Sequence, residues 1–120
     1  MKDLFPVTIA PETIYSDRLR IEPIIGDSMA PRLRGGRDFV LIKPVDSYQG
    51  EGTYLWSDGV GKSFCNVHST LGGKLRLWHE NKLYSEHFLT RDEFSEICLG
   101  IVVADVAVRA EHILRMEIAQ

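Results

Sequence analysis

The stretch IIGDSMAPRL, residues 24–33, joins two β-branched residues directly to a Gly-Asp-Ser turn, and a proline follows Ser28 three positions later. β-branched residues favour strands, whereas Gly and Asp favour tight turns. The pattern therefore predicts a strand that delivers Ser28 into a glycine-containing turn. Such a turn exposes the hydroxyl beside backbone N–H groups, the arrangement needed to attack a carbonyl carbon and stabilise the oxyanion. The plainer alternative is that Ser28 caps a short turn over residues 29–33.

Short strand-like runs separated by turn residues make up most of the chain. Alternating apolar residues predict a strand over 18–25, although Pro23 restricts it to a sheet edge or a bulge. The pairs Asp58-Gly59 and Gly72-Gly73 predict two hairpin turns. The last run is rich in valine and is typical of a central strand. The other predicted strands cover 38–45, 52–56, 62–68, 74–78 and 98–108, and helical patterns are confined to 90–97 and 109–120.

Length and charge restrict the classes of function. A chain of 120 residues with 44% hydrophobic and 26% charged residues is typical of one globular domain with a single core. Because no repeat or linker divides it, we expect a single domain over residues 1–120. The formal net charge of −3 argues against a DNA-binding surface in this domain, since non-specific affinity comes from clustered Lys and Arg. Contact with DNA would therefore need a separate domain.

The sequence has features of a cytoplasmic protein. Cys65 and Cys98 are its two cysteines, and their wide spacing in apolar surroundings predicts buried, reduced thiols. No apolar run is long enough to span a membrane. The first residues, MKDLFPVTIAPE, contain prolines and acids where a signal peptide needs an uninterrupted apolar stretch. We expect no membrane contact.

The histidines do not supply an obvious base for Ser28. None has an Asp at informative spacing, so a Ser-His-Asp site cannot be assembled. Cys65 and His68 point to opposite faces of a strand, which argues against a zinc site, and we expect neither a metal nor another cofactor. The other known activator is a lysine that burial keeps neutral. The four histidines are His68, His79, His87 and His112.

Several motifs in order resemble the carboxy-terminal domain of the LexA-like repressors, a family that includes phage repressors and the UmuD-type mutagenesis proteins. They are GDSMAPRL, GGRDFVLI, GTYLW, GGKLRLWHEN and LGIVVADV, and the resemblance covers residues 19–108. The family's Asp-Gly-Asp element departs here, because Gly35 stands in place of the first Asp, while Asp38 matches the second.

The resemblance implies a mostly-β domain with few short helices, built from the twisted β-sheets that LexA shares with signal peptidases. It also implies a homodimer or higher homo-oligomer. In active members a serine–lysine dyad cuts the protein's own chain upstream of the serine when activated RecA filaments bind, so a RecA filament is a further implied partner. A signal-peptidase function, which uses the same dyad chemistry, is disfavoured because no membrane anchor is present.

Carried over residue by residue, the resemblance makes Ser28 the nucleophile. The amides around Met29 and Ser28 would hold the oxyanion, and Gly26, Asp27 and Pro31 match positions that form the loop. The lysine is a departure. Lys62 is the natural partner by elimination, because it is the only lysine between the two hairpin turns.

Counting from the two turns instead places Phe64 where many relatives carry the lysine. Lys62 and Phe64 share one face of a strand, but two residues displace a side chain by about 6.6 Å. A general base needs hydrogen-bond contact at about 3 Å. A slip in the hairpin would restore the dyad, so both positions stay open.

Two hypotheses follow. One is a self-cleaving repressor domain with Ser28 and Lys62 as its catalytic dyad. The other is a cleavage-inactive module that pairs subunits so that attached DNA-binding domains reach two operator half-sites. No helix-turn-helix pattern precedes Ser28, so the chain is either a piece of a longer repressor or a standalone relative. Candidate interface residues are the run 98–108 and the tail residues Ile113, Leu114, Met116 and Ile118, although an amphipathic terminal helix more often packs on its own core.

Overall fold

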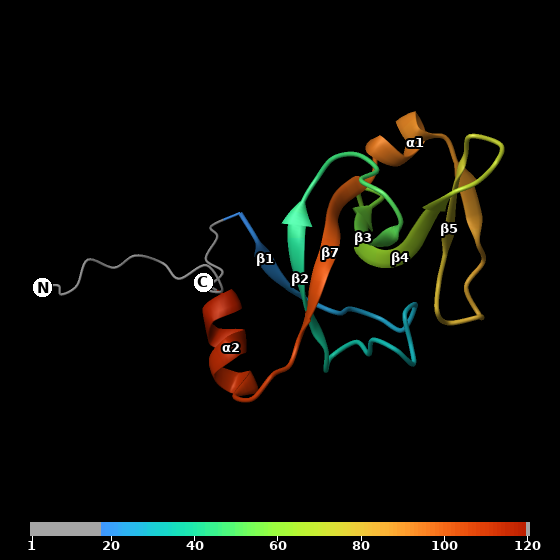
Figure 1. Ribbon diagram of the computed structural model, residues 1–120. Helices are drawn as coiled ribbons and strands as arrows, with labels where there is room; N and C mark the ends of the chain where they lie inside the picture. The colour runs from blue at the N-terminus through green and yellow to red at the C-terminus, as the bar shows by residue number, and fades with distance from the viewer. Residues whose placement is uncertain (1–17, 120) are drawn as a thin grey trace, which may run out of the picture.

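The computed structural model describes residues 18–119 and shows a mostly-β molecule with two short helices (Figure 1). The expected absence of a signal peptide falls on residues outside this range, as does most of the segment before Ser28. All strands belong to one antiparallel sheet with the order β1-β2-β7-β3-β4-β5-β6. The elements are β1 (Arg20–Pro23), β2 (Phe39–Pro44), β3 (Gly52–Ser57), β4 (Lys62–Ser69), β5 (Leu75–Trp78), β6 (His87–Leu89), α1 (Arg91–Ser95), β7 (Cys98–Val106) and α2 (Glu111–Ile118).

The sheet order confirms the two positional predictions made for strands. Pro23 ends β1, which lies at one edge of the sheet, where a residue without an N–H costs no ladder hydrogen bond. The valine-rich β7 lies between β2 and β3, inside the sheet. The opposite edge is β6, a strand that the sequence pattern did not predict.

The two faces of the sheet carry two separate cores. Alternation along β3 sends Leu55 to one face and Tyr54 to the other, and along β4 it separates Phe64 from Cys65 in the same way. The loop-side core consists of Ile24, Met29, Leu33, Val40, Ile42, Leu55 and Phe64. The helix-side core consists of Tyr54, Cys65, Val67, Leu75, Leu77, Phe94 and Cys98, with both cysteines free and buried as predicted.

The β3–β4 hairpin determines which residues of β4 face each core. Leu55 pairs with Phe64, and Ser57 pairs with Lys62. Gly59 has φ +92°, and the Asp58 carboxylate accepts hydrogen bonds from the amides of residues 60 and 61, so the predicted Asp-Gly turn is confirmed. The turn fixes the register. A one-residue slip would move every side chain of β4 to the opposite face.

The two helices differ in how they contact the sheet. α1 begins with a capping box between Thr90 and Glu93, and its Phe94 is buried edge-on against Tyr54 at a centroid distance of 5.2 Å. α2 follows β7 and has no buried residue. Its Arg115 donates to the carbonyl of residue 36 at 3.1 Å and lies 5.0 Å from the centre of the Phe39 ring. α1 therefore completes the helix-side core, whereas α2 buries no side chain and contacts residue 36 and Phe39 through Arg115.

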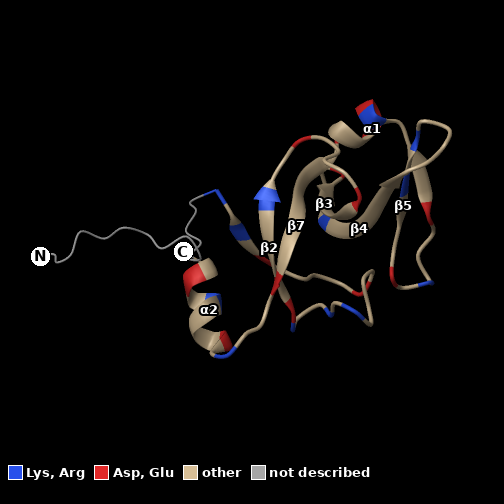
Figure 2. Ribbon diagram, in the orientation of Figure 1, with Lys and Arg blue, Asp and Glu red and all other residues tan. Residues whose placement is uncertain are grey.

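Charged residues are interspersed over the molecule (Figure 2). Lys and Arg positions and Asp and Glu positions are both scattered over the strands, loops and helices. Within residues 18–119, no helix has the length and apolar character needed to cross a membrane.

Candidate functional site

The Ser28 loop, residues 24–38, connects β1 to β2 and folds back on itself. The Ile24 amide donates to the Asp38 carbonyl at 2.8 Å, and the Gly35 amide donates to the Gly26 carbonyl at 3.1 Å. Gly26 has φ +77°, a conformation that a residue with a side chain adopts only with strain. These contacts make the loop a closed unit whose one apolar side, including Met29, joins the loop-side core.

Ser28 points inward from this loop to β4. The residue is only 5% exposed, so the expectation of an exposed hydroxyl was wrong. Its Oγ lies 3.3 Å from the Oγ of Ser63 and 3.4 Å from the carbonyl oxygen of Phe64. Both contacts are longer than the usual O–H···O range of about 2.5–3.0 Å. Since they join the loop to a distant strand, Ser28 links two elements and does not act as a helix cap.

Lys62 lies at the start of β4 with its ammonium group directed elsewhere. Its Nζ is 3.5 Å from the Glu22 carboxylate of β1, and its side chain is 45% exposed. A lysine serves as a general base only where burial keeps it neutral. The structure does not bring Lys62 into hydrogen-bond contact with Ser28.

Phe64 occupies the β4 position that faces the Ser28 loop. Its side chain is 2% exposed and packs in the loop-side core with Met29 and Leu33. The register Leu55–Phe64 holds it there. An aromatic ring therefore lies where the resemblance to the LexA-like repressors predicts a lysine, and the Ser28 hydroxyl lies 3.4 Å from the backbone carbonyl oxygen of that same residue.

A second loop, residues 79–86, covers the other side of the Ser28 loop. The Asn81 amide donates to the Ser28 carbonyl at 3.0 Å, and its side chain donates to the Asp27 carbonyl at 3.0 Å. The Tyr84 hydroxyl donates to the Asp27 carboxylate. Pro31, the other loop position singled out from the sequence, is exposed. Sequence reasoning missed Asn81 and Tyr84, because only the fold brings residues 79–86 next to Ser28.

Asp38 closes the end of the Ser28 loop. Its carboxylate accepts a hydrogen bond from the Arg34 amide at 2.7 Å and pairs with the Arg37 guanidinium at 3.2 Å. The backbone hydrogen bond, and secondarily Arg37, hold the pKa of Asp38 below its ordinary value of 3.8. The ionised form is therefore favoured in the folded protein, and Asp38 stabilises the loop whenever its carboxyl is ionised.

Replacing Asp38 by Asn is expected to lower the free energy of unfolding by about 1 kcal/mol at pH 7, because a charge-assisted hydrogen bond becomes a neutral one. A carboxyl group whose pKa is lower in the folded than in the unfolded protein stabilises the fold at pH values above its unfolded pKa. This stabilisation is lost as the pH falls through the folded pKa. The difference between wild type and D38N should therefore shrink as pH falls below 3.8. Urea unfolding between about pH 2.5 and 7 measures it.

Arg37→Ala is the companion variant. Since the Arg34 amide is the larger cause of the shift, R37A should keep most of the pH dependence that D38N removes. Equal slopes of unfolding free energy against pH in wild type and D38N would contradict this account.

The chemistry available at the site follows from these contacts. The Ser28 hydroxyl has a second hydroxyl and a carbonyl as neighbours, and neither is a base strong enough to deprotonate it at neutral pH. Among residues 18–119, no group of three or more His, Cys, Asp and Glu is placed to hold a metal ion. No protein-family model matches the sequence, and no curated protein matches it either.

Proposed function

We propose that this chain is a subunit-pairing domain of a LexA-like transcriptional repressor, in which the serine–lysine chemistry of the family is absent. One observation carries the proposal. Phe64 fills the position expected for the lysine, and Lys62 is paired with Glu22 instead of Ser28. The domain keeps the serine loop as a structural element and acts by association. DNA is then reached only through a separate domain.

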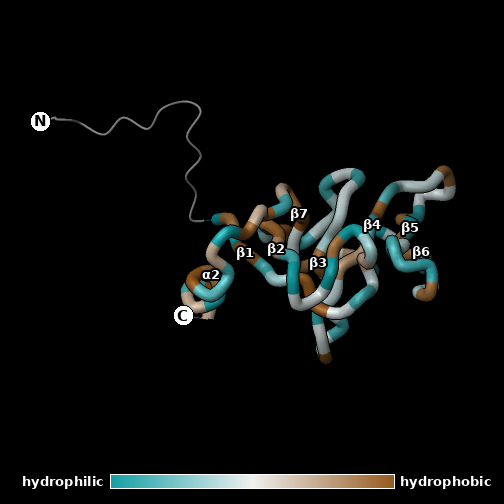
Figure 3. Tube along the Cα trace, turned by 90° about the horizontal axis from the view of Figure 1, so that it is seen from below, coloured by the Kyte–Doolittle hydropathy of each residue, from teal (hydrophilic) through white to brown (hydrophobic). Residues whose placement is uncertain are grey.

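α2 offers the surface for pairing. Ile113 is 54% exposed, and none of the side chains described for this helix is buried. Figure 3 shows hydrophobic positions along α2, at the end of the molecule away from β5 and β6. A self-complementary contact between two such helices buries apolar surface on both copies, as a two-fold homodimer does. Pairing would then place two attached DNA-binding domains on adjacent half-sites.

Replacing Ile113 by Asp is expected to weaken self-association at least about 30-fold, because a central apolar contact of this kind is worth about 2 kcal/mol and a buried unpaired charge adds to the loss. Sedimentation velocity over a range of concentrations measures the dissociation constant. Leu71→Asp is the matched control, since Leu71 is fully exposed in the β4–β5 turn, far along the chain from α2. The pairing role would be overturned if the wild-type chain stayed monomeric at millimolar concentration. It would also be overturned if L71D weakened self-association as much as I113D.

The absence of self-cleavage has its own test. Incubating the chain at about pH 10, where a lysine of ordinary pKa begins to lose its proton, should leave it intact by mass spectrometry. The Ser28→Ala and Lys62→Ala variants should behave in the same way. Fragments that appear in wild type and vanish in both variants would instead establish the catalytic dyad.

A further inference from the structure

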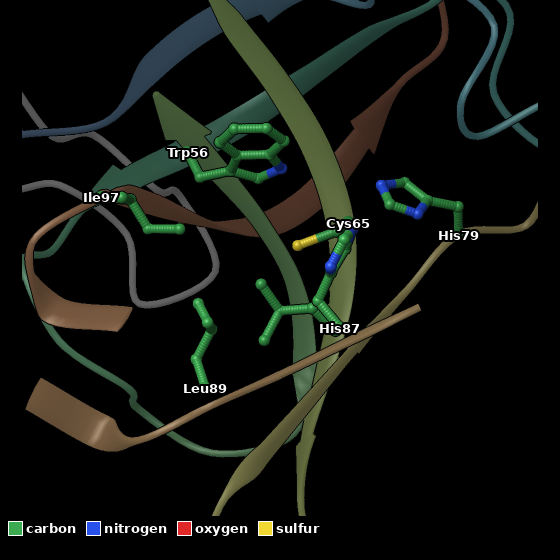
Figure 4. Close-up of a pocket in the computed structure, with 7 residues that line it drawn as sticks. Trp56, Cys65, His79, His87, Leu89 and Ile97 are labelled. Carbon is green, nitrogen blue, oxygen red and sulfur yellow. The ribbon is translucent and has the colours of Figure 1, made fainter. Parts of the chain in front are cut away.

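A cavity of about 180 Å³ lies on the helix-side face of the sheet, apart from the Ser28 loop (Figure 4). Its inner wall is apolar and belongs to the helix-side core, and its outer wall is formed by β6, where His87 is exposed. The cavity therefore reaches the surface beside an edge strand. The lining residues are Trp56, Cys65, Leu77, His79, His87, Leu89 and Ile97.

Strand register brings the lining residues together. Trp56 of β3 pairs with Ser63 of β4, and Leu77 of β5 pairs with Val67 of β4. Ser63, Cys65 and Val67 are two residues apart along β4 and therefore lie on the same face. His79 follows Leu77 by two residues and so continues its alternation. Figure 4 shows the indole of Trp56 and the imidazole of His79 directed toward each other from the two sides of β4.

Two nitrogen atoms on these walls lack a hydrogen-bond partner in the part of the chain that the structure describes. They are Nε1 of Trp56 and Nδ1 of His79, and both are buried. Trp78 shows the ordinary situation, because its Nε1 donates to Nδ1 of His68 at 3.3 Å. A buried polar atom without a partner costs about 1–3 kcal/mol, so a pair of them at one cavity calls for an occupant.

The two atoms have complementary hydrogen-bonding character. The Trp56 indole N–H is only a donor. Burial lowers the pKa of His79 below its ordinary 6.5, so the neutral ring is favoured at pH 7. A neutral imidazole has one N–H and one lone pair, so the tautomer with its proton on Nε2 leaves Nδ1 as an acceptor. The cavity thus presents one donor and one acceptor.

Apart from the exposed His87 on β6, the rest of the wall consists of a thiol and aliphatic side chains. Burial raises the pKa of the Cys65 thiol to about 12, so it is a neutral thiol at pH 7. Leu77, Leu89 and Ile97 supply aliphatic surface. An ionic ligand would be poorly solvated here, whereas an apolar one would be favoured.

We propose that this cavity binds a small neutral ligand with an apolar body of ring size and one hydroxyl group, which accepts a hydrogen bond from Trp56 Nε1 and donates one to His79 Nδ1. A hydroxyl is a fitting partner because it does both at once. The volume agrees with a single ring, since an apolar protein cavity of about 150 Å³ binds benzene. Water would satisfy the same two nitrogens and leave the apolar wall without contacts.

Phenol and toluene test the proposal as probes of nearly equal shape, because toluene carries a methyl group where phenol carries the hydroxyl. The full chain, labelled with ¹⁵N, is titrated with each and followed through its indole N–H resonances in NMR spectra. Phenol should shift the Trp56 resonance saturably and leave that of Trp78 in place. Its dissociation constant should be at least about tenfold lower than that of toluene, since a site built for a hydroxyl rejects the analogue without it.

Variants locate the two hydrogen bonds. His79→Phe should abolish the preference for phenol over toluene while leaving toluene binding intact. Trp56→Phe, followed through its backbone amide resonances because it lacks the Trp56 indole, should lose the preference in the same way. Trp78→Phe is the control, because it removes an indole that already has a partner. Thermal unfolding of each variant checks that it is folded. Toluene binding as tight as phenol binding, equal preference in wild type and H79F, or no saturable phenol shift up to about 10 mM would each overturn the proposal.

Discussion

Replacing Phe64 by Ala is expected to lower the free energy of unfolding by about 3–5 kcal/mol, the usual cost of deleting a buried aromatic ring. Phe64 is 2% exposed and packs between β4 and the Ser28 loop. The loss therefore includes the transfer energy of the ring and the cavity left beside Met29. It is a large part of the stability of a domain of this size, which is about 5–15 kcal/mol. Urea unfolding followed by circular dichroism measures the change in midpoint.

Phe88→Ala is the matched control. Phe88 is half exposed on the edge strand β6, so the same chemical deletion should cost well under half as much. Should F64A fail to fold, Phe64→Leu retains most of the apolar volume and should fall between the other two variants. Equal losses for F64A and F88A would show that the Ser28 loop does not pack on β4, and would remove the support for the proposal that the domain lacks the dyad.

The position of Phe64 also shows how far the sequence alone leads. Its turn pairs predicted the β3–β4 hairpin, and the Asp58-Gly59 turn is present as expected. Counting along the strand pointed to Phe64, while elimination pointed to Lys62. The deciding fact is the register of one hairpin, which is set by turn geometry and by packing on both faces. Local pattern has no access to that packing, so it left the partner of Ser28 open.

Other features depend entirely on contacts between distant segments. The strand β6 is short and lies at an edge, and its three residues carry no clear alternation. The cavity joins Trp56 of β3 to His79 after β5, and nothing near either residue indicates the other. Asn81 contacts the Ser28 loop only because the chain returns there after β5. Residue pattern thus predicted the elements well, and the sites made between elements poorly.

Replacing Gly35 by Ala is expected to destabilise the protein by about 3 kcal/mol, at the upper end of the usual cost of overpacking. A Cβ atom at this position would lie 2.3 Å from the carbonyl oxygen of Gly26 and 2.7 Å from its nitrogen. Both are backbone atoms, so no side chain can rotate to relieve the clash. The loop would have to open and lose the hydrogen bond from Gly35 to Gly26. Urea unfolding measures the loss of stability, and hydrogen exchange of the loop amides reports the opening.

Gly35 stands where the resemblance to the LexA-like repressors predicts an Asp, and the close approach to Gly26 leaves no room for a side chain there. Variants of two other glycines separate the effect of steric overlap from that of backbone strain. Gly36 has φ +78° with open space around its Cβ position, so Gly36→Ala should cost only about 1 kcal/mol of backbone strain. Gly61 has open space and no such φ, so Gly61→Ala should be nearly neutral. G35A should therefore destabilise the protein most, G36A less and G61A least. If G35A were as mild as G61A, the two arms of the loop would not touch, and Ser28 would lack the rigid support that keeps it against β4.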